Sequence, residues 1–266
     1  MAKNGPKEGT TGDMNTEMSV PSNHLELFVK AGRDGESYGA CPFCHRMFMI
    51  LLLKANAGEL TFTVTTVNMS KPPPDFKKLS SRLPVVVHGN EVLCDSDDIV
   101  QYIDDNFPNP DLRFNNQKAA EASLGCFSKF SFYIKEVSLS PTHLISELMK
   151  MDSYLAGAKT EFLCCNELSH LDCLMLPKLH HIRVVSKVFK NFEFPHEFVH
   201  LWRYLANAYR CEVFRKTCPP DQEIIYHWAS KPELPRLSKD ASIMYGPETV
   251  PRYTFDVPIK QINGHW

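Results

Sequence analysis

Hydrophobic and polar side chains alternate along residues 24–30. They alternate again along residues 60–67, a stretch rich in Thr and Val. Such alternation is typical of a strand with one buried face. Between these stretches, the apolar run from Met47 to Leu53 predicts a buried helix. Asn56-Ala57-Gly58 predicts its end, because Asn and Gly tolerate the left-handed backbone of a helix C-cap. A strand, a crossover helix and a second strand form a βαβ unit, whose two strands are parallel.

The segment that follows also mixes helices and strands. After a proline-rich turn, residues 75–81 predict a short helix. Residues 83–93 hold two apolar runs on either side of Gly89-Asn90, which predicts a β-hairpin. Short polar and acidic side chains then open a helix over residues 94–106, where they can cap its free N–H groups. Residues 23–106 therefore predict a β-α-β-α-β-β-α module.

Helical patterns follow a linker at residues 107–116, whose first four residues include two prolines. The apolar spacing predicts helices at 117–137, 141–155, 173–189, 195–209 and 221–228. Ser169 and Asp172 resemble a capping box before the third of these, with Asp in the place of the usual Glu. The fold class is thus α/β plus all-α. Its parts are a disordered lead-in at 1–22, an α/β domain at 23–106, the linker, an all-helical domain at 117–230 and an extended or disordered tail at 231–266.

Composition and charge narrow the functional classes. The 266 residues are 43% hydrophobic and 23% charged, an ordinary balance for a soluble protein, and the formal net charge of −2 argues against general nucleic-acid binding. The nine cysteines are an odd number without framework spacing, and no apolar secretory segment opens the chain, so a cytoplasmic, reduced protein is expected. The longest apolar run, Met47 to Leu53, is far shorter than the roughly 20 residues of a spanning helix.

The most specific chemical signal is Cys41-Pro42-Phe43-Cys44, at the junction of the first predicted strand and helix. The first turn of a helix has unpaired N–H groups and the positive end of the helix dipole, which stabilise a thiolate and can lower a thiol pKa from ~8.5 to roughly 3.5–7.5. Cys41 is the candidate nucleophile and Cys44, one turn later, the candidate resolving thiol. The alternatives are two inert core cysteines or half of a zinc site. Zinc would require a second pair at similar spacing, and the sequence has none.

These motifs resemble a known family. A thioredoxin-like half followed by an all-helical half is the layout of the glutathione transferases, and the match is closer to the chloride intracellular channel (CLIC) family. The resemblance rests on residues 25–32, Cys41 to Met49, Leu83-Pro84-Val85, Asp95-Ser96, Ser169 to Pro177 and Asp221 to Ile224. It covers roughly residues 23–230. It implies a thioredoxin-like or glutaredoxin-like first domain and a glutathione-transferase-like second domain.

The resemblance also implies a glutathione site. Cys41 would supply the thiol, the backbone of Leu83 before a cis Pro84 would pair with the peptide, and Asp95 and Ser96 would hold its γ-glutamyl end. Plain helix capping explains the last two residues about equally well. No metal is expected as a cofactor, because the spacings of the histidines match no ligand pattern.

Three further features have two interpretations each. The family implies that Lys30 and Arg46 line a pore, although solvated charges on the surface explain them at least as well. His45 can assist the thiol, but a solvated histidine is the favoured interpretation. Cys164-Cys165 can sense oxidation, yet two buried apolar side chains explain the pair better.

The sequence departs from the family pattern at a few positions. Cys44 stands where many animal members have Ser, which makes a dithiol possible, and Leu52 stands where several members have Trp. The stretch at 56–60 is longer than in vertebrate members. Together with the proline-rich turn at 71–76, these features are similar to those of invertebrate-type members.

Two functions follow. The resemblance implies a protein that is monomeric when soluble and can insert into membrane lipid as an oligomeric anion (chloride) channel, and hence a cytoplasmic location with reversible membrane association. Insertion would require residues 42–67 to refold as a spanning helix whose charges, Arg46, Lys54 and Glu59, face water or pair. The alternative is a cytosolic glutathione-dependent thiol-disulfide oxidoreductase that uses Cys41, which the residues support more directly. A third possibility is a non-catalytic scaffold that has kept the fold.

Overall fold

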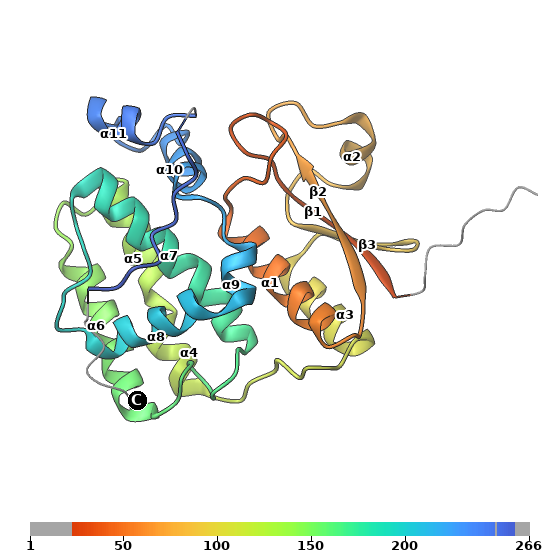
Figure 1. The fold of residues 1–266 in the computed structure, drawn as a ribbon, viewed down its shortest axis with the longest axis horizontal. Coiled ribbons are helices and arrows are strands. Elements are labelled where there is room, and N and C mark those ends of the chain that lie inside the picture. The colour runs from red at the N-terminus through yellow and green to blue at the C-terminus, as the bar shows by residue number, and fades with distance from the viewer. Residues whose placement is uncertain (1–22, 248, 259–266) are drawn as a thin grey trace, which may run out of the picture.

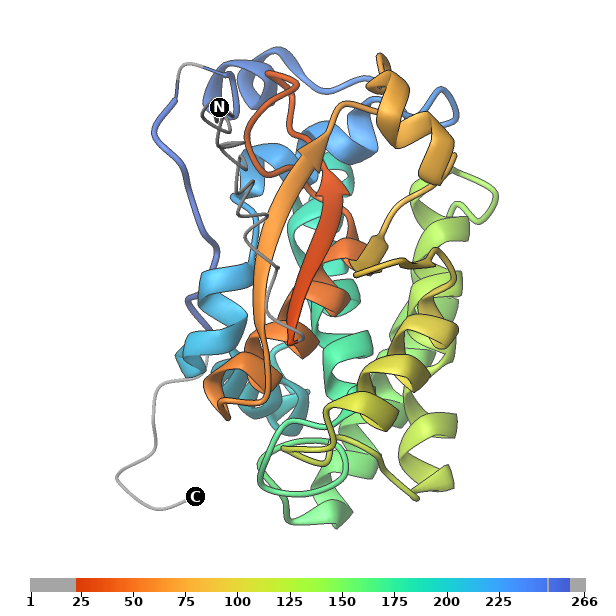
Figure 2. The same ribbon diagram turned by 90° about the vertical axis from the view of Figure 1, so that its right-hand side faces the viewer.

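The computed structural model describes residues 23–247 and 249–258, so the lead-in expected at 1–22 and the end of the tail lie outside the described residues. Figure 1 shows a small sheet with short helices beside a larger bundle of helices. In Figure 2 the sheet faces the viewer, and the first helix lies behind the strands, between the sheet and the bundle. The expected order, an α/β part before an all-helical part, is confirmed.

The first part contains four strands and three helices. They are β1 (His24–Lys30), α1 (Pro42–Asn56), β2 (Thr61–Val67), α2 (Pro74–Leu79), β3 (Val85–His88), β4 (Glu91–Leu93) and α3 (Ser96–Asn106). The strand order is β2-β1-β3-β4, with β1 and β2 parallel as the βαβ unit requires and the other pairs antiparallel. The hairpin turns at Gly89, whose φ of +59° is a conformation that glycine adopts without a side-chain clash.

The bundle differs from the predicted helices at three places, one of which is a short helix over residues 212–217 that the apolar spacing does not predict. Its helices are α4 (Gln117–Ser123), α5 (Gly125–Ile134), α6 (Thr142–Ala158), α7 (His170–Lys190), α8 (Val199–Arg210), α9 (Glu212–Thr217), α10 (Asp221–Ala229) and α11 (Lys239–Met244). The single helix predicted at 117–137 is wrong, because the poor helix formers Ser123 and Gly125 flank a break between α4 and α5. The helix predicted from Pro195 begins later, because the Pro195 carbonyl accepts the Phe198 N–H in a separate turn.

The capping box predicted before the long helix is confirmed at the start of α7. The Asp172 carboxylate accepts hydrogen bonds from the Ser169 N–H at 2.9 Å and from its hydroxyl at 2.6 Å. The same carboxylate also accepts the Leu163 N–H and the Tyr204 hydroxyl, each at 2.9 Å. Since Asp172 is fully buried, this one side chain fixes α7, α8 and the preceding loop to one another.

Buried charges join the two parts of the chain. The Lys54 ammonium in α1 has no exposed side-chain surface and lies 3.0 Å from the Asp104 carboxylate in α3. It also donates to the Pro110 carbonyl of the linker at 2.9 Å. The other oxygen of Asp104 lies 2.7 Å from Nε2 of His170, the first residue of α7. The network therefore connects α1, α3, the linker and the bundle.

The tail is more structured than its lack of periodicity predicts. It contains α11, and its later residues run back over the bundle (Figure 1). The Thr254 hydroxyl donates to the buried carboxylate of Asp221 at 2.6 Å. The Phe255 ring lies 5.3 Å from the ring of Tyr209, centre to centre. A hydrogen bond and ring contacts thus hold the described end of the tail against the bundle.

Candidate functional site

Two thiols lie where β1 leads into α1. Cys41 is the N-cap of α1, with an extended backbone (φ −158°, ψ 121°), and Pro42 is the first helical residue. Cys44 is fully buried one turn later, whereas Cys41 is partly exposed. Gly39 allows the loop to pass close to β1, because a side chain there would collide with the Ala31 carbonyl. The more exposed thiol is thus held at the start of the helix.

The surroundings of Cys41 favour its thiolate. A hydrogen bond from the Cys44 thiol, then the backbone N–H groups of Cys44 and Phe43 and the charge of Lys30, lower the pKa of Cys41 from 9.0 to about 7, although burial opposes them. The same hydrogen bond and burial raise the pKa of Cys44 well above its usual value. About half of Cys41 is therefore ionised near neutral pH, beside a thiol that stays protonated. A nucleophile with a neighbouring resolving thiol would need such a difference in acidity.

Residues from the bundle also shape the electrostatic surroundings of Cys41. No local sequence pattern indicates that they lie near this thiol. Nζ of Lys30, at the end of β1, lies 3.0 Å from Nδ1 of His227 in α10. Burial, and after it the charges of Lys30 and Lys231, lower the pKa of His227 to about 3, so its neutral ring can accept this hydrogen bond. Lys231 also interacts electrostatically with Cys41. Two ammonium groups, one from each part of the chain, thus act on the thiol.

The proline loop lies near the same end of β1. The Leu83–Pro84 peptide bond is cis. Val85 pairs with Phe28 in the antiparallel register, so the two residues before Val85 run alongside the end of β1, where the loop to Cys41 departs. The structure therefore brings Leu83 and Pro84 to the region of the thiol.

Asp95 and Ser96 lie at the start of α3. The Asp95 carboxylate caps the helix by accepting the Asp97 N–H at 3.0 Å, and it lies 3.5 Å from the Arg82 guanidinium. Ser96 is the first helical residue and is partly exposed. The capping role of Asp95 is thus observed, and a role of either residue in ligand binding remains a prediction.

His45 and Arg46, which follow Cys44 in the sequence, are more buried than the sequence predicts. His45 is fully buried rather than solvated, its Nε2 lies 3.0 Å from the Thr217 hydroxyl of α9, and burial lowers its pKa to about 3. The Arg46 side chain is 10% exposed rather than solvated, and its guanidinium lies 3.5 Å from the Asp97 carboxylate. Both expectations are wrong because α7 and α9 pack on this face of α1, which the local sequence does not reveal.

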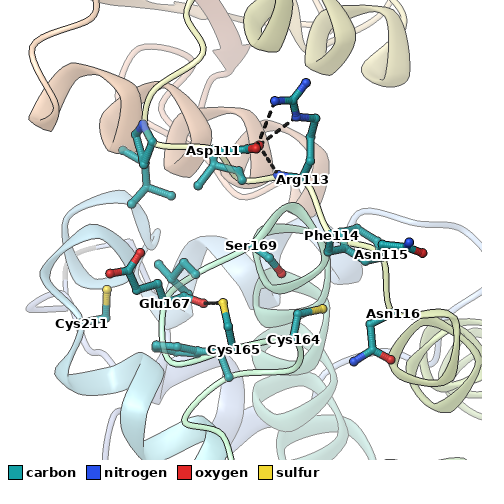
Figure 3. Close-up of a pocket in the computed structure, with 15 residues that line it drawn as sticks. Asp111, Arg113, Phe114, Asn115, Asn116, Cys164, Cys165, Glu167, Ser169 and Cys211 are labelled. Carbon is teal, nitrogen blue, oxygen red and sulfur yellow. Dashed lines mark hydrogen bonds and ion pairs between the residues drawn. The ribbon is translucent and has the colours of Figure 1, made fainter.

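The expectation for Cys164-Cys165 is also wrong, since Cys164 is partly exposed and Cys165 exposed. Both line a cavity of about 540 Å³ between the linker and the loop before α7 (Figure 3). The Cys165 thiol donates to the Glu167 carbonyl at 3.2 Å. The pair belongs to an irregular loop, where small apolar residues need not be buried. Across the described ranges, no three His, Cys, Asp or Glu side chains gather in a way that could hold a metal ion.

Comparison with known proteins agrees with this architecture. Residues 23–110 match the family described as the CLIC-like N-terminal domain. The chain is similar to the solved structure of the CLIC homologue EXC-4 from C. elegans, with 26% identity, a TM-score of 0.77, and coverage of 89% of this chain and 94% of that one. It is also similar to dehydroascorbate reductase from Chlamydomonas reinhardtii, with 27% identity, a TM-score of 0.68, and coverage of 77% and 96%.

A more distant structure has the same fold. Glutathione transferase Omega 1C from Trametes versicolor is 15% identical, with a TM-score of 0.61 and coverage of 78% of this chain and 96% of that one. The resemblance to the CLIC family and the glutathione-transferase-like fold, both expected from the sequence, are therefore confirmed.

Proposed function

We propose that the chain, whose residues 23–110 match the family described as the CLIC-like N-terminal domain, is a glutathione-dependent thiol-disulfide oxidoreductase whose nucleophile is Cys41. One observation carries the proposal. Cys41 lies at the N-cap of α1 with its pKa lowered to about 7, next to a second thiol that donates a hydrogen bond to it. A structural cysteine needs neither a lowered pKa nor a hydrogen bond from a second thiol. A thiol that attacks disulfides near neutral pH must be both ionised and accessible.

The reaction is a pair of thiol–disulfide exchanges. The Cys41 thiolate attacks the glutathione sulfur of a mixed disulfide, so a Cys41–glutathione disulfide forms and the substrate sulfur leaves as a thiolate that takes up a proton. A second glutathione thiolate then attacks the adduct, which releases glutathione disulfide and regenerates the Cys41 thiolate. Alternatively, Cys44 loses its proton and attacks Cys41, which releases reduced glutathione and leaves a Cys41–Cys44 disulfide. Two further glutathione molecules reduce that disulfide.

The peptide part of glutathione would lie along the proline loop. The backbone of Leu83, next to cis Pro84, would pair with an extended peptide. The N–H of Ser96, at the start of α3, suits a carboxylate, because the first N–H groups of a helix lack partners within the helix. Asp95 suits the α-amino group of the γ-glutamyl end. The ammonium groups of Lys30 and Lys231 add positive charge that favours an anionic peptide.

The test is reduction of a small mixed disulfide of glutathione, coupled to the consumption of reduced glutathione. The wild-type protein should turn over, and Cys41→Ser should abolish turnover. Cys165→Ser is the matched control, because it removes an exposed thiol outside the site and should retain activity. Unchanged activity in the Cys41 variant would remove the enzymatic proposal.

A second candidate function is an anion channel formed when the N-terminal module leaves the bundle and oligomerises in lipid. One observation favours it: two buried histidines lie where the first part of the chain meets the bundle, His45 of α1 against Thr217 and His170 of α7 against Asp104 of α3. In the soluble fold, Lys30 contacts His227, so a role in lining a pore, like that of Arg46, would belong to the inserted form. None of the helices in the described ranges is both long and apolar enough to cross a bilayer.

The channel proposal is tested with chloride-loaded anionic vesicles. Chloride should leak when the protein is added at acid pH and should leak less at neutral pH. Burial lowers the pKa values of His45 and His170, so their protonation disfavours the packing of the first part of the chain against the bundle. An absence of leak at every pH would count against a channel and leave the thiol reaction unaffected.

A further inference from the structure

One face of α10 holds the loop between β1 and α1. Glu223 and His227 are four residues apart in this helix, so their side chains lie on the same face. The Glu223 carboxylate accepts the backbone N–H of Arg33 at 3.0 Å. The charge of Lys30 also acts on this carboxylate and lowers its pKa, although burial outweighs it. The bundle therefore contacts the chain a few residues before the two thiols.

His227 contacts both ends of the same loop. Its Nδ1 lies 3.0 Å from Nζ of Lys30, the last residue of β1. The ring also forms a hydrogen bond with the backbone of Ala40, the residue immediately before Cys41. Because Nδ1 accepts from the ammonium, the proton of the neutral ring is on Nε2, which can donate to the Ala40 carbonyl. The loop thus fixes the orientation of the ring, and the ring fixes the ammonium.

The neutral ring holds Lys30 without cancelling its charge. The ion pairs between described residues do not include this lysine. A carboxylate partner would neutralise the ammonium, whereas an uncharged imidazole fixes its position and leaves its charge to act on Cys41. Burial, and after it the charges of Lys30 and Lys231, lower the pKa of His227 to about 3. The ring is therefore neutral throughout the pH range in which Cys41 ionises.

We propose that His227 is a positioning residue for the thiol reaction: it holds the Lys30 ammonium where that charge favours the thiolate of Cys41. The inference rests on the role of Cys41 proposed above and deepens it, because it makes the acidity of the thiol depend on contact with the bundle. A lysine side chain is long and flexible, so a hydrogen bond that fixes it keeps its charge near the sulfur. Without α10, the same loop would carry a less acidic thiol.

The test is the pH dependence of Cys41 alkylation in the full-length protein, with the modified peptide identified by mass spectrometry. His227→Leu removes no charge, yet it should raise the inflection by about half a unit to one unit, so the rate at pH 7 should fall roughly two- to fivefold. Because His227 acts through Lys30, adding His227→Leu to Lys30→Met should cause no further shift, whereas independent effects would add. His227→Asn should keep the inflection near that of the wild type, because its amide oxygen can accept in the place of Nδ1.

His180→Leu is the matched control, because it removes another buried histidine of the bundle, one that contacts Tyr209. It should leave the inflection unchanged. Nitrogen NMR of the wild-type protein supplies a test that needs no variant to fold: at neutral pH the proton of the His227 ring should be on Nε2. Alkylation requires no turnover, so these results stand apart from the success or failure of the glutathione assay. An unshifted inflection in His227→Leu, an equal shift in the control, additive shifts in the double variant, no rescue by Asn or a proton on Nδ1 would each overturn the proposal.

Discussion

The hydrogen bond between the two thiols supports a sharp prediction about the acidity of Cys41. Its largest contributor is the Cys44 thiol, which lowers the pKa of Cys41 to about 7. A hydrogen bond to a charged group contributes about 1.5–3 kcal/mol, which corresponds to about one to two pKa units. Cys44→Ala should therefore raise the pKa of Cys41 to roughly 8–9, and the ionised fraction at pH 7 should fall from about half to roughly 1–10%.

Cys44→Ser provides the control, because it keeps an O–H donor at the same position while removing the resolving thiol. Its Cys41 should retain a pKa near that of the wild type. The assay is the rate of alkylation of Cys41 as a function of pH, with the modified peptide identified by mass spectrometry so that the other cysteines do not contribute. If Cys44→Ala and the wild type show the same inflection, the thiol hydrogen bond does not set the acidity of Cys41 and the reasoning fails.

Three further predictions concern charges around α1. Lys30→Met should raise the pKa of the nucleophilic thiol, by the same alkylation assay, because it removes an ammonium that favours the thiolate; a lowered pKa would contradict this. Asp104→Leu should destabilise the fold by about 3–5 kcal/mol in urea unfolding, because it leaves the buried ammonium of Lys54 without its carboxylate partner. Adding Lys54→Met should recover part of the lost stability. Burial lowers the pKa values of His45 and His227 from 6.5 to about 3, so unfolding takes up protons and stability should fall as the pH drops from about 6.5 toward 3. A pH-independent urea midpoint across that range would refute this.

The parts of the fold that the sequence predicts well are those with local causes. The alternation in β1 and β2, the turn at Gly89 and the capping box of Ser169 and Asp172 each depend on residues close in the chain, and each is found in the structure. The position of Cys41 at the start of α1 has the same kind of cause.

The errors arise where distant elements meet. His45 looks solvated in the sequence, but α9 covers it, and Arg46 is enclosed in a similar way near α7. The contact of Lys30 with His227 joins residues that lie 197 positions apart, so no local pattern could indicate it. Burial and charge around the candidate site are thus set by the packing of the bundle against α1.

Trapping the covalent intermediate tests the central claim most directly. Cys44→Ser protein, which cannot resolve an adduct internally, is incubated with glutathione disulfide at neutral pH and mapped by mass spectrometry. The expected result is a glutathione adduct on Cys41 that forms faster than on exposed Cys165 and is released by reduced glutathione. Adducts on other cysteines with Cys41 unmodified would contradict a nucleophilic role for this sulfur.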